Sequence, residues 1–347
     1  MANKKRVAVA LSGGVDSSVS ALLLKNQNFE VVGITGKMVE DENFETVCKN
    51  AKAVADKLEI EHYILDLSKD FKKNIIDYFV NSYKNGKTPN PCIVCNKTIK
   101  WGAIFDYAIN ELNCDYIATG HYADIVEKDG QFLLYPAKDT KKDQLYYLFE
   151  LNQNQLSKTI FPLKNLEKSQ IRQIALENDL PSKSSKESQD ICFIKKPYTT
   201  KKYLLEKIKS QKGEFILSKT GEVIGHHEGF FQYTIGQRKG IGIAYSEPLY
   251  VTGLDPVNNK VFCGVKEELY SDKLVLDNFN LHDKNFVNGQ ALVKIRYNMP
   301  SVETDIEFEE NKATVNFKEP VSGITKGQAC VVYSKTDGHL IGGGWIK

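Results

Sequence analysis

The chain has 347 residues, of which 41% are hydrophobic and 26% are charged. At roughly 150 residues per domain, this length predicts two or three globular domains and excludes a small disulfide-stapled fold. No apolar run reaches the roughly 18 residues of a membrane span, and the first residues lack a signal-peptide pattern, so we expect neither a membrane anchor nor export. The net charge of +2 does not indicate a nucleic-acid binder, although residues 164–212 carry twelve basic and six acidic side chains and could contact phosphates.

The cysteines point to a reducing compartment. Their number is odd and no export signal precedes them, so we expect a cytoplasmic protein whose thiols serve chemistry or packing. Four of them match no motif and are interpreted as packing residues: Cys48, Cys114, Cys263 and Cys330. The other three are Cys92, Cys95 and Cys192.

The first half of the chain alternates short apolar runs with helical patterns. Such alternation predicts an α/β fold with a doubly wound parallel sheet, which binds ligands at the carboxyl ends of its strands. The expected strands are 6–11, 30–35, 62–67 and 116–119, and the expected helices are 17–25, 44–58, 70–83 and 97–112.

The pattern changes after about residue 202, where short runs with period-two alternation take over. In 291–297, the clearest run, Ala291, Val293, Ile295 and Tyr297 fall on one face. Further strands are expected at 304–308, 313–317, 329–333 and 340–346, which together indicate a C-terminal antiparallel β-barrel. We expect three domains: 1–202, a glycine- and aromatic-rich central domain at 203–270, and the barrel at 271–347.

A glycine-rich loop follows the first strand. Ser12-Gly13-Gly14-Val15-Asp16-Ser17-Ser18 leads directly into a helix. Glycines allow close approach of a ligand to the backbone, and the amides and dipole at the helix start form an anion site. The Gly-Lys-Ser/Thr of a Walker loop is absent. The segment resembles the pyrophosphate-binding (PP) loop of ATP pyrophosphatases that adenylate a substrate; the alternative is a turn and helix cap without a ligand.

Further motifs make the resemblance more specific. Thr88-Pro-Asn-Pro-Cys92-Ile-Val-Cys95-Asn-Lys97, Ala118-Thr-Gly120-His121-Tyr122, Lys142-Asp143-Gln144 and Ser188-Gln-Asp-Ile-Cys192-Phe193 occur in this order. They are followed by Gly225-His226, Thr234-Ile-Gly236-Gln-Arg-Lys-Gly240, Lys294-Ile-Arg296-Tyr297 and Gly327-Gln328. Nearly end to end, the sequence resembles the tRNA-specific 2-thiouridylase family.

This resemblance implies an ATP-dependent tRNA-uridine 2-sulfurtransferase that adenylates the oxygen on carbon 2 of the wobble uridine of Lys, Glu and Gln tRNAs and replaces that oxygen by sulfur. Its partners would be tRNA and a cysteine desulfurase or sulfur carrier, and Mg²⁺ would accompany ATP. By similarity, residues 1–202 form the adenylation domain and 203–270 contact tRNA. The implied ATP-binding residues are Ala10, Leu11, Ser12, Gly13, Gly14, Val15, Asp16, Ser17, Gly36 and Gly120.

The resemblance assigns Cys95 as the nucleophile and Cys192 as the persulfide carrier of a disulfide relay. A helix start with Lys97 and Lys100 nearby would favour the reactive thiolate. Where many members have Asp, this chain has Cys92, and three thiolates with one open iron suit an iron–sulfur cluster. We therefore favour a [4Fe-4S] cluster held by Cys92, Cys95 and Cys192, with the relay as the open alternative and zinc as a weaker one.

The resemblance also implies the tRNA contacts. The flipped target base would meet Asn90, Pro91 and Cys92, because chemistry on a base requires it to leave the stack. Other positions that match tRNA contacts are His121, Lys142, Asp143, Gln144, Arg296, Tyr297 and Gln328. Two other functions stay open: an adenylating PP-loop synthetase that acts on a small molecule, and a non-catalytic RNA-binding protein.

Overall fold

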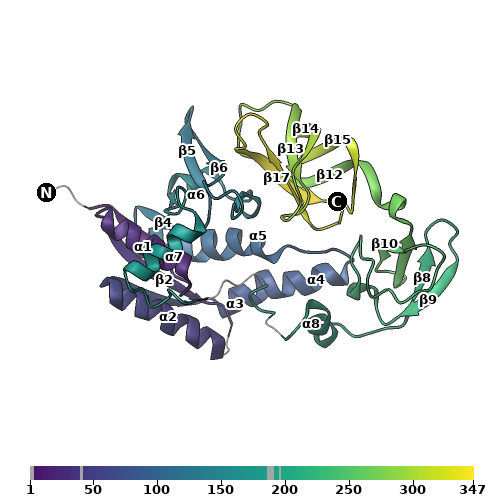
Figure 1. The fold of residues 1–347 in the computed structure, drawn as a ribbon, viewed down its shortest axis with the longest axis horizontal. Coiled ribbons are helices and arrows are strands. Elements are labelled where there is room, and N and C mark those ends of the chain that lie inside the picture. Colours follow the sequence, from purple (N-terminus) through teal and green to yellow (C-terminus); the bar gives the residue numbers. More distant parts are fainter. Residues whose placement is uncertain (1–3, 40–41, 186–190, 195–196) are drawn as a thin grey trace. The chain divides into compact units, whose positions relative to one another are not determined.

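The computed structural model describes residues 4–39, 42–185, 191–194 and 197–347, and its chain divides into two compact units (Figure 1). The first unit comprises Met1–Ile76, Cys92–Gln189 and Thr336–Ile341, and the second comprises Asp77–Pro91, Asp190–Lys335 and Gly342–Lys347. In the described part of the chain, no helix is both long enough and apolar enough to span a bilayer. The expected domain boundaries near residues 202 and 270 stay a prediction.

A parallel five-stranded sheet forms the centre of the first unit, as the alternating pattern predicts. Its strand order is β3-β2-β1-β4-β7, and each neighbouring pair is parallel. The strands are β1 (Arg6–Ala10), β2 (Glu30–Lys37), β3 (Glu61–Asp66), β4 (Tyr116–Ala118) and β7 (Thr159–Ile160). The two residues of β7 are too few to give a periodic signal, so the sequence did not indicate this strand.

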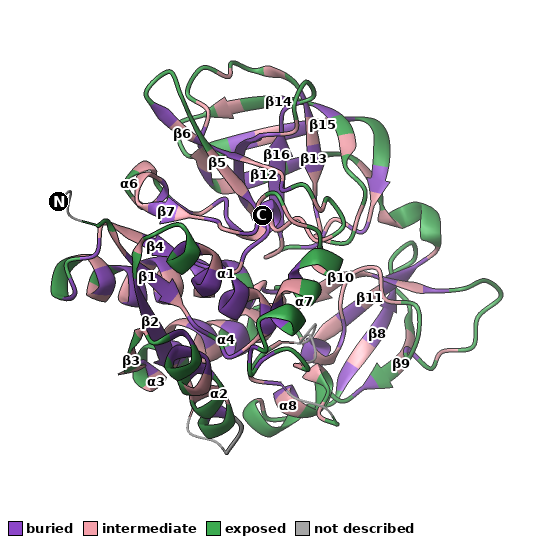
Figure 2. Cartoon of the chain, turned by 60° about the vertical axis from the view of Figure 1, so that its left-hand side comes forward, coloured by how far each residue is buried: buried purple, intermediate pink, exposed green. Residues whose placement is uncertain are grey.

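Three helices share one apolar core with β1, seen as the purple residues around α1 in Figure 2. They are α1 (Val15–Asn26), α2 (Glu42–Leu58) and α7 (Lys168–Glu177). Val19, Ala51 and Ile171, one from each helix, are fully buried in this core. α1 is buried over most of its surface, and the burial of the three helices in this core is the main source of their stability.

The chain from β3 to β4 is also largely helical. It runs through α3 (Ser68–Phe71), a π-helical stretch (Lys72–Asp77), α4 (Tyr78–Lys84), α5 (Pro91–Cys95) and two further π-helical stretches (Asn96–Ile104 and Tyr107–Glu111). The expected helix at 97–112 is therefore present but wider than an α-helix: the Phe105 amide bonds to the Lys100 carbonyl, five residues back. Such π-turns are frequent at functional sites.

The strand order reverses between β1 and β4. The chain proceeds from β1 to β2 and β3 on one side, then returns to place β4 and β7 on the other. In an open α/β sheet this reversal leaves a crevice at the carboxyl ends of the two strands, where ligands bind. Residues 11–14 follow β1 and residues 119–121 follow β4, so both motifs lie at this position.

Smaller elements complete the first unit. β5 (Asp124–Lys128) and β6 (Gln131–Tyr135) form an antiparallel hairpin. Its turn residues Asp129 and Gly130 both have positive φ, as a two-residue hairpin turn requires; the Asp-Gly dipeptide is the sequence signal for it. A 3-10 turn (Leu145–Tyr147) and α6 (Gln153–Ser157) follow.

The second unit contains a four-stranded sheet of order β10-β11-β8-β9. The strands are β8 (Gly213–Leu217), β9 (Val223–His227), β10 (Tyr250–Asp255) and β11 (Lys260–Gly264); two 3-10 turns (Phe230–Gln232 and Lys266–Leu269) and α8 (Thr200–Lys207) accompany them. Phe215, Val251 and Val261 of this sheet share one buried cluster with Phe79 of α4 and Leu204 of α8.

The C-terminal strands close into a barrel in the order β12-β15-β14-β13-β16-β17, which confirms the predicted antiparallel β-barrel. They are β12 (Tyr270–Leu281), β13 (Gly289–Lys294), β14 (Val302–Glu309), β15 (Lys312–Ser322), β16 (Ala329–Tyr333) and β17 (Leu340–Ile346). Ala291, Val293 and Ile295 are buried as their alternation predicts. Tyr297 lies beyond the end of β13 and is only partly buried.

Candidate nucleotide and cysteine sites

The loop after β1 is held by its own serines. The Ser12 amide donates to Ser17 Oγ at 3.2 Å, and Ser17 Oγ donates to the Gly14 carbonyl at 3.1 Å. Ser18 Oγ donates to the same carbonyl at 2.8 Å. Gly14, in extended conformation, is the N-cap of α1, so the amides of the first turn face the loop and form an anion site.

Gly13 must be glycine for two reasons. Its φ of +71° is a conformation that L side chains rarely adopt, and a Cβ on it would lie 2.9 Å from Asn50 Cβ and 3.0 Å from the Val47 carbonyl oxygen of α2. The loop therefore packs against α2 with no room for a side chain.

Gly120, just after β4, lies equally close to the start of α1. A Cβ there would be 2.9 Å from Asp16 Cβ and 2.9 Å from the Ser17 amide nitrogen. The ends of β1 and β4 therefore meet directly. The third predicted glycine, Gly36 in β2, has apolar surroundings: a Cβ there would lie 3.1 Å from a methyl group of Leu67 and 3.4 Å from one of Ile104.

Asp16 carries the only carboxylate of the loop and has two partners. Lys168 Nζ lies 2.7 and 2.8 Å from its two oxygens, and the Tyr122 hydroxyl donates to it at 2.9 Å. The Lys168 side chain is only 13% exposed, so this ion pair is largely shielded from water. The sequence did not single out Lys168, because its partner is 152 residues away; its only local signal is its position at the first residue of α7.

A hollow of about 280 Å³ lies beside Lys168. Its lining carries three lysines and two carboxylates, which gives it a basic character suited to phosphate groups. The lining residues are Lys138, Asp139, Thr140, Lys141, Glu167, Lys168 and Ser169.

Cys92 and Cys95 lie one turn apart on the helix that begins at Pro91. Proline suits the first helical position, because its missing N–H has no partner there in any helix. Cys92 is exposed, Cys95 is half-buried, and none of the seven cysteines, all in the described part of the chain, forms a disulfide. Residues three apart on a helix lie on one face, so the two thiols can act on one ligand.

The two lysines after Cys95 have different partners. Lys97 Nζ pairs with Glu150 at 2.6 Å, so its charge is compensated. Cys92 is exposed, but many protein atoms lie near its thiol. These atoms partly desolvate the thiol and raise the pKa of Cys92, whereas the positive charge of Lys100 lowers it. The expectation that both lysines favour the reactive thiolate stays a prediction.

His121 is 8% exposed. It connects the end of β4 to Lys100, in the π-helical stretch that directly follows the helix of Cys92 and Cys95, called the cysteine helix from here on. Lys100 Nζ donates to its Nε2 at 3.3 Å, and Nδ1 is 2.7 Å from Thr119 Oγ1. Burial, reinforced by Lys100, lowers the pKa of His121 well below its usual value, so the ring is neutral and donates from Nδ1 to Thr119. Its predicted tRNA contact stays a prediction; what the structure shows is that it positions Lys100.

Cys192 belongs to the second unit. It lies in a turn closed by the hydrogen bond from the Ile194 amide to the Ile191 carbonyl, at 2.8 Å, and its side chain is exposed. The neighbouring Phe193 ring packs edge-on against Phe79 at 5.3 Å. Residues 186–190, which include most of the motif before Cys192, lie outside the described residues, and the three-cysteine arrangement stays a prediction.

Two predicted tRNA-binding residues of the second unit, Arg296 and Gln328, make contacts within that unit. Arg296 Nη2 donates to the Gly323 carbonyl at 2.5 Å and to Thr325 Oγ1 at 2.7 Å, and lies 3.4 Å from the Ile235 carbonyl. The Gln328 side chain donates to backbone carbonyls before the cysteine helix. In the first unit, Gln144 Oε1 accepts from the Tyr122 amide at 3.0 Å, whereas Lys142 and Asp143 are partly exposed. Their contacts with tRNA stay a prediction.

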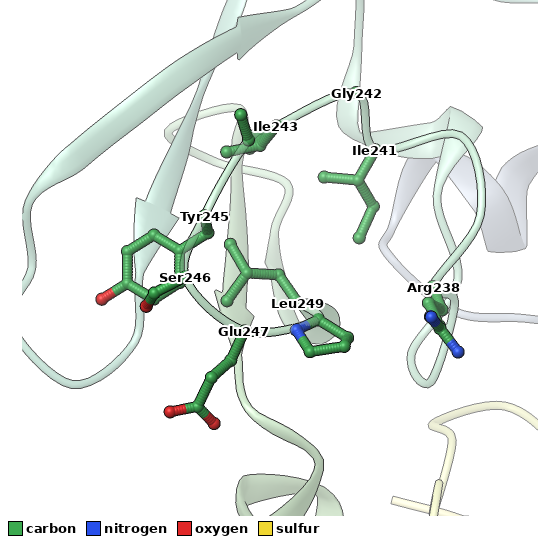
Figure 3. A pocket seen from close by; sticks show the side chains of 10 residues that line it. Arg238, Ile241, Gly242, Ile243, Tyr245, Ser246, Glu247 and Leu249 are labelled. Carbon is green, nitrogen blue, oxygen red and sulfur yellow. The ribbon is translucent and has the colours of Figure 1, made fainter.

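A second hollow, of about 380 Å³, lies in the loop between β9 and β10 (Figure 3). Arg238 and Ile241 line one side, and Tyr245, Ser246 and Glu247 line the other. One positive side chain, Arg238, and one negative side chain, Glu247, line this hollow. None of the predicted site residues lines it, so it is not the predicted catalytic site.

Comparisons with known proteins agree with this geometry. The family model described as tRNA methyl transferase HUP domain matches residues 5–196; models described as tRNA methyl transferase PRC-barrel domain and aminomethyltransferase beta-barrel domain match 201–265 and 271–346. Two relatives are tRNA-specific 2-thiouridylases, MnmA 2 of Clostridium botulinum (strain Hall) and MnmA of Clostridium perfringens (strain 13). Each is 41% identical, and each match covers 99% of both chains.

The chain belongs to the tRNA-specific 2-thiouridylase family. Although the model descriptions speak of methyl transfer, the relatives matched over their whole length are named for thiolation, and the PP-loop geometry agrees with the relatives. Among solved structures, the U34-tRNA thiolase NcsA from Methanococcus maripaludis with its [4Fe-4S] cluster is 23% identical with a TM-score of 0.37, over 59% of this chain and 63% of that one.

The crowding around Gly13 gives a first prediction. Gly13→Ala should destabilise the first unit and abolish ATP binding, because the new Cβ meets α2 and the loop must shift. Gly130→Ala is the matched control, since Gly130 has the same φ of +71° but nothing within 4 Å. Thermal unfolding and equilibrium binding of ATP measure both effects. If the two variants bind ATP equally well, steric contact with α2 is not what keeps Gly13 a glycine.

The position of Lys100 gives a second prediction. Lys100→Met should raise the pKa of Cys92 further, because the positive charge that opposes desolvation is removed. At pH 8 the alkylation of Cys92 by iodoacetamide should slow about threefold, because a smaller fraction of the thiol is ionised. Peptide mass spectrometry measures the rate at each cysteine across pH 7–10. Lys97→Met is the control: its charge is already paired with Glu150, so the Cys92 profile should not move, and equal shifts in both variants would contradict the assignment.

Proposed function

We propose that this chain is a tRNA sulfurtransferase that adenylates the wobble uridine and replaces its carbon-2 oxygen by sulfur. The observation that carries the proposal is the convergence, at the switch point of one parallel sheet, of a phosphate-binding loop, a lysine salt-bridged to its aspartate and the strand end that leads to His121. Family membership supplies the class of substrate. Each step below rests on residues of this chain.

Activation begins with ATP at the loop. The uracil oxygen attacks the α-phosphorus, pyrophosphate leaves, and the base carries AMP as a good leaving group on carbon 2. The backbone amides at the start of α1 bind phosphate oxygens. When ATP enters, Lys168 leaves the Asp16 carboxylate and binds a phosphate group instead. The basic hollow beside Lys168 accommodates the departing pyrophosphate.

Mg²⁺ is part of this proposal. Asp16 is a hard oxygen ligand of the kind that Mg²⁺ prefers, and it lies beside the phosphate-binding amides. Lys168 holds both of its oxygens in the structure, so Asp16 becomes available to a metal once Lys168 turns to the phosphates. Bound there, Mg²⁺ would neutralise charge on the phosphates.

The cysteines supply the sulfur by one of two routes. In the relay, Cys192 carries a persulfide, Cys95 attacks it and releases sulfide, and the resulting Cys95–Cys192 disulfide takes up two electrons from an external reductant before the next turnover. Sulfide then bonds to carbon 2, and AMP leaves with the original oxygen. A cysteine desulfurase or sulfur-carrier protein would load Cys192.

The second route uses a [4Fe-4S] cluster, which we favour. Cys92 and Cys95 fit as ligands: they are one turn apart, neither forms a disulfide, and Cys92 is exposed. Cys192 would be the third ligand. When bound, a cluster with one open iron supplies a binding position for hydrosulfide. Lys100, held by neutral His121, would then offset the negative charge of the Cys92 thiolate.

RNA recognition is proposed at the start of the cysteine helix. Asn90 and Pro91 directly precede Cys92, so a flipped base that meets them also meets the thiols. Lys142 and Asp143 are partly exposed and suit polar contacts with tRNA. The proposed role of Arg296 is indirect, because its guanidinium already binds backbone carbonyls.

Anaerobic protein incubated with ATP, unmodified tRNA and a sulfide or persulfide donor should produce 2-thiouridine, detected by mass spectrometry of digested tRNA. Cys95→Ser and Cys192→Ser should abolish the product, whereas Cys48→Ala, at a cysteine outside every motif, should not.

Iron and acid-labile sulfide that disappear together with activity in Cys92→Ala would establish the cluster. Full activity of iron-free protein with a persulfide donor would establish the relay. Pyrophosphate release stimulated by a small acid and not by tRNA would refute the proposal.

Lys168 gives a prediction that concerns the activation step alone. Lys168→Met should weaken ATP binding at least about tenfold, because a charge-assisted contact to phosphate is lost and the Asp16 carboxylate is left to repel the nucleotide. Lys164→Met is the control, since Lys164 pairs instead with Asp124 at 2.8 Å. Isothermal titration with ATP measures both; equal affinities would remove Lys168 from the phosphate site.

A further inference from the structure

The segment that leads into the cysteine helix is held by a turn of the β-barrel. The Thr88 amide donates to the Lys326 carbonyl at 2.9 Å. The side-chain amide of Gln328 donates back to the Thr88 carbonyl at 3.0 Å and lies 3.4 Å from the Pro89 carbonyl. Both polar groups of Thr88's backbone are therefore bonded to one turn.

Gly327 allows the turn to come this close. Its φ is +85°, and a Cβ on it would lie 2.8 Å from Lys87 Cβ and 3.2 Å from the Thr88 carbonyl oxygen. The turn is itself fixed to β17: the Gly327 amide donates to the Ile346 carbonyl at 2.9 Å, and the Ile346 amide donates to the Gln328 carbonyl at 2.8 Å. Gln328 is thus anchored to the barrel through its backbone while its side chain is directed to Thr88.

The same segment is fixed on its N-terminal side. The Lys87 amide donates to the Ser82 carbonyl of α4 at 3.0 Å, and a Cβ on Gly86 would lie 3.1 Å from Pro256 Cγ. Residues 86–89 therefore contact α4, the turn after β10 of the four-stranded sheet, and the barrel. A connection this short and this tightly bonded cannot change direction without breaking several of them.

Little freedom remains between Thr88 and the first thiol. Only Pro89, Asn90 and Pro91 intervene before Cys92. Proline fixes φ near −65°, so two of these three residues have restricted backbones, and Pro89 and Pro91 are both buried. The backbone path of Asn90 and Pro91 is therefore determined largely by the position of Thr88.

We propose that Gln328 is a positioning residue for the thiolation reaction: by bonding the carbonyls of Thr88 and Pro89, it fixes the backbone from which Asn90 and Pro91 meet the target base. The inference rests on the proposed function for what Asn90 and Pro91 do, and on the hydrogen bonds for how their backbone is held. It differs from the expectation that Gln328 contacts tRNA, because its amide donors are directed to the protein's own backbone.

Gln328→Leu and Gln328→Glu test the proposal. Both keep the size of the side chain and lose its N–H donors, and the glutamate adds a charge that would repel RNA. We expect kcat for thiolation to fall about 10- to 100-fold in both, with the affinity for tRNA within about twofold of wild type, because misplacement of a reacting group by about an ångström has an effect of this size. Lys326→Ala is the control: only its backbone carbonyl takes part and its side chain is exposed.

Hydrogen exchange at the Thr88 amide gives a readout that needs no substrate. Exchange should be faster in both Gln328 variants than in wild type and Lys326→Ala, since the Thr88 backbone then keeps only its amide bond to the Lys326 carbonyl and opens more often. Weaker tRNA binding with unchanged kcat, strongest for Gln328→Glu, would overturn the proposal and assign Gln328 to RNA. Unchanged exchange would overturn it as well. If wild-type protein makes no 2-thiouridine, the proposed function fails, whereas the exchange measurement still decides whether Gln328 holds Thr88.

Discussion

The nucleotide site depends on the contact between Gly120, after β4, and the first turn of α1. A Cβ on Gly120 would lie 2.9 Å from atoms of Asp16 and Ser17, so with any side chain at this position the segment after β4 could not pack as closely against α1. This approach brings Tyr122, two residues later, within reach of the Asp16 carboxylate, and it places His121 beside the helix that carries the cysteines. One missing side chain therefore lets two strand ends form one site.

Asp16 connects this contact to the rest of the first unit. Its carboxylate joins the loop after β1, the segment after β4 and, through Lys168, the start of α7. The three elements come from positions 16, 122 and 168 of the chain, so the ion pair also holds α7 at the nucleotide site. Ligand binding that draws Lys168 away would release one of these connections.

Much of the fold and the location of the loop could be predicted because their signals are local. Strand, glycine-rich loop and helix follow each other within 20 residues, and alternation in 291–295 directly gives the buried face of β13. Pairings between distant residues leave no such signal. Lys168 has no local mark of its bond to Asp16, and the sequence could identify Arg296 and Gln328 by their motifs without showing that both bind backbone carbonyls. The sequence also could not show that Lys97 pairs with Glu150, because the two residues are 53 positions apart.

The neutral state of His121 has a consequence for how the cysteine helix responds to acidity. An exposed histidine changes its charge between about pH 6 and 7, and one placed beside a thiol would alter the electric field at that thiol over this pH range. His121 is buried and accepts a hydrogen bond from Lys100, so it stays uncharged throughout that range. The charge of His121 therefore does not change the electrostatic environment of Cys92 between about pH 6 and 7, and Lys100 is its positive neighbour.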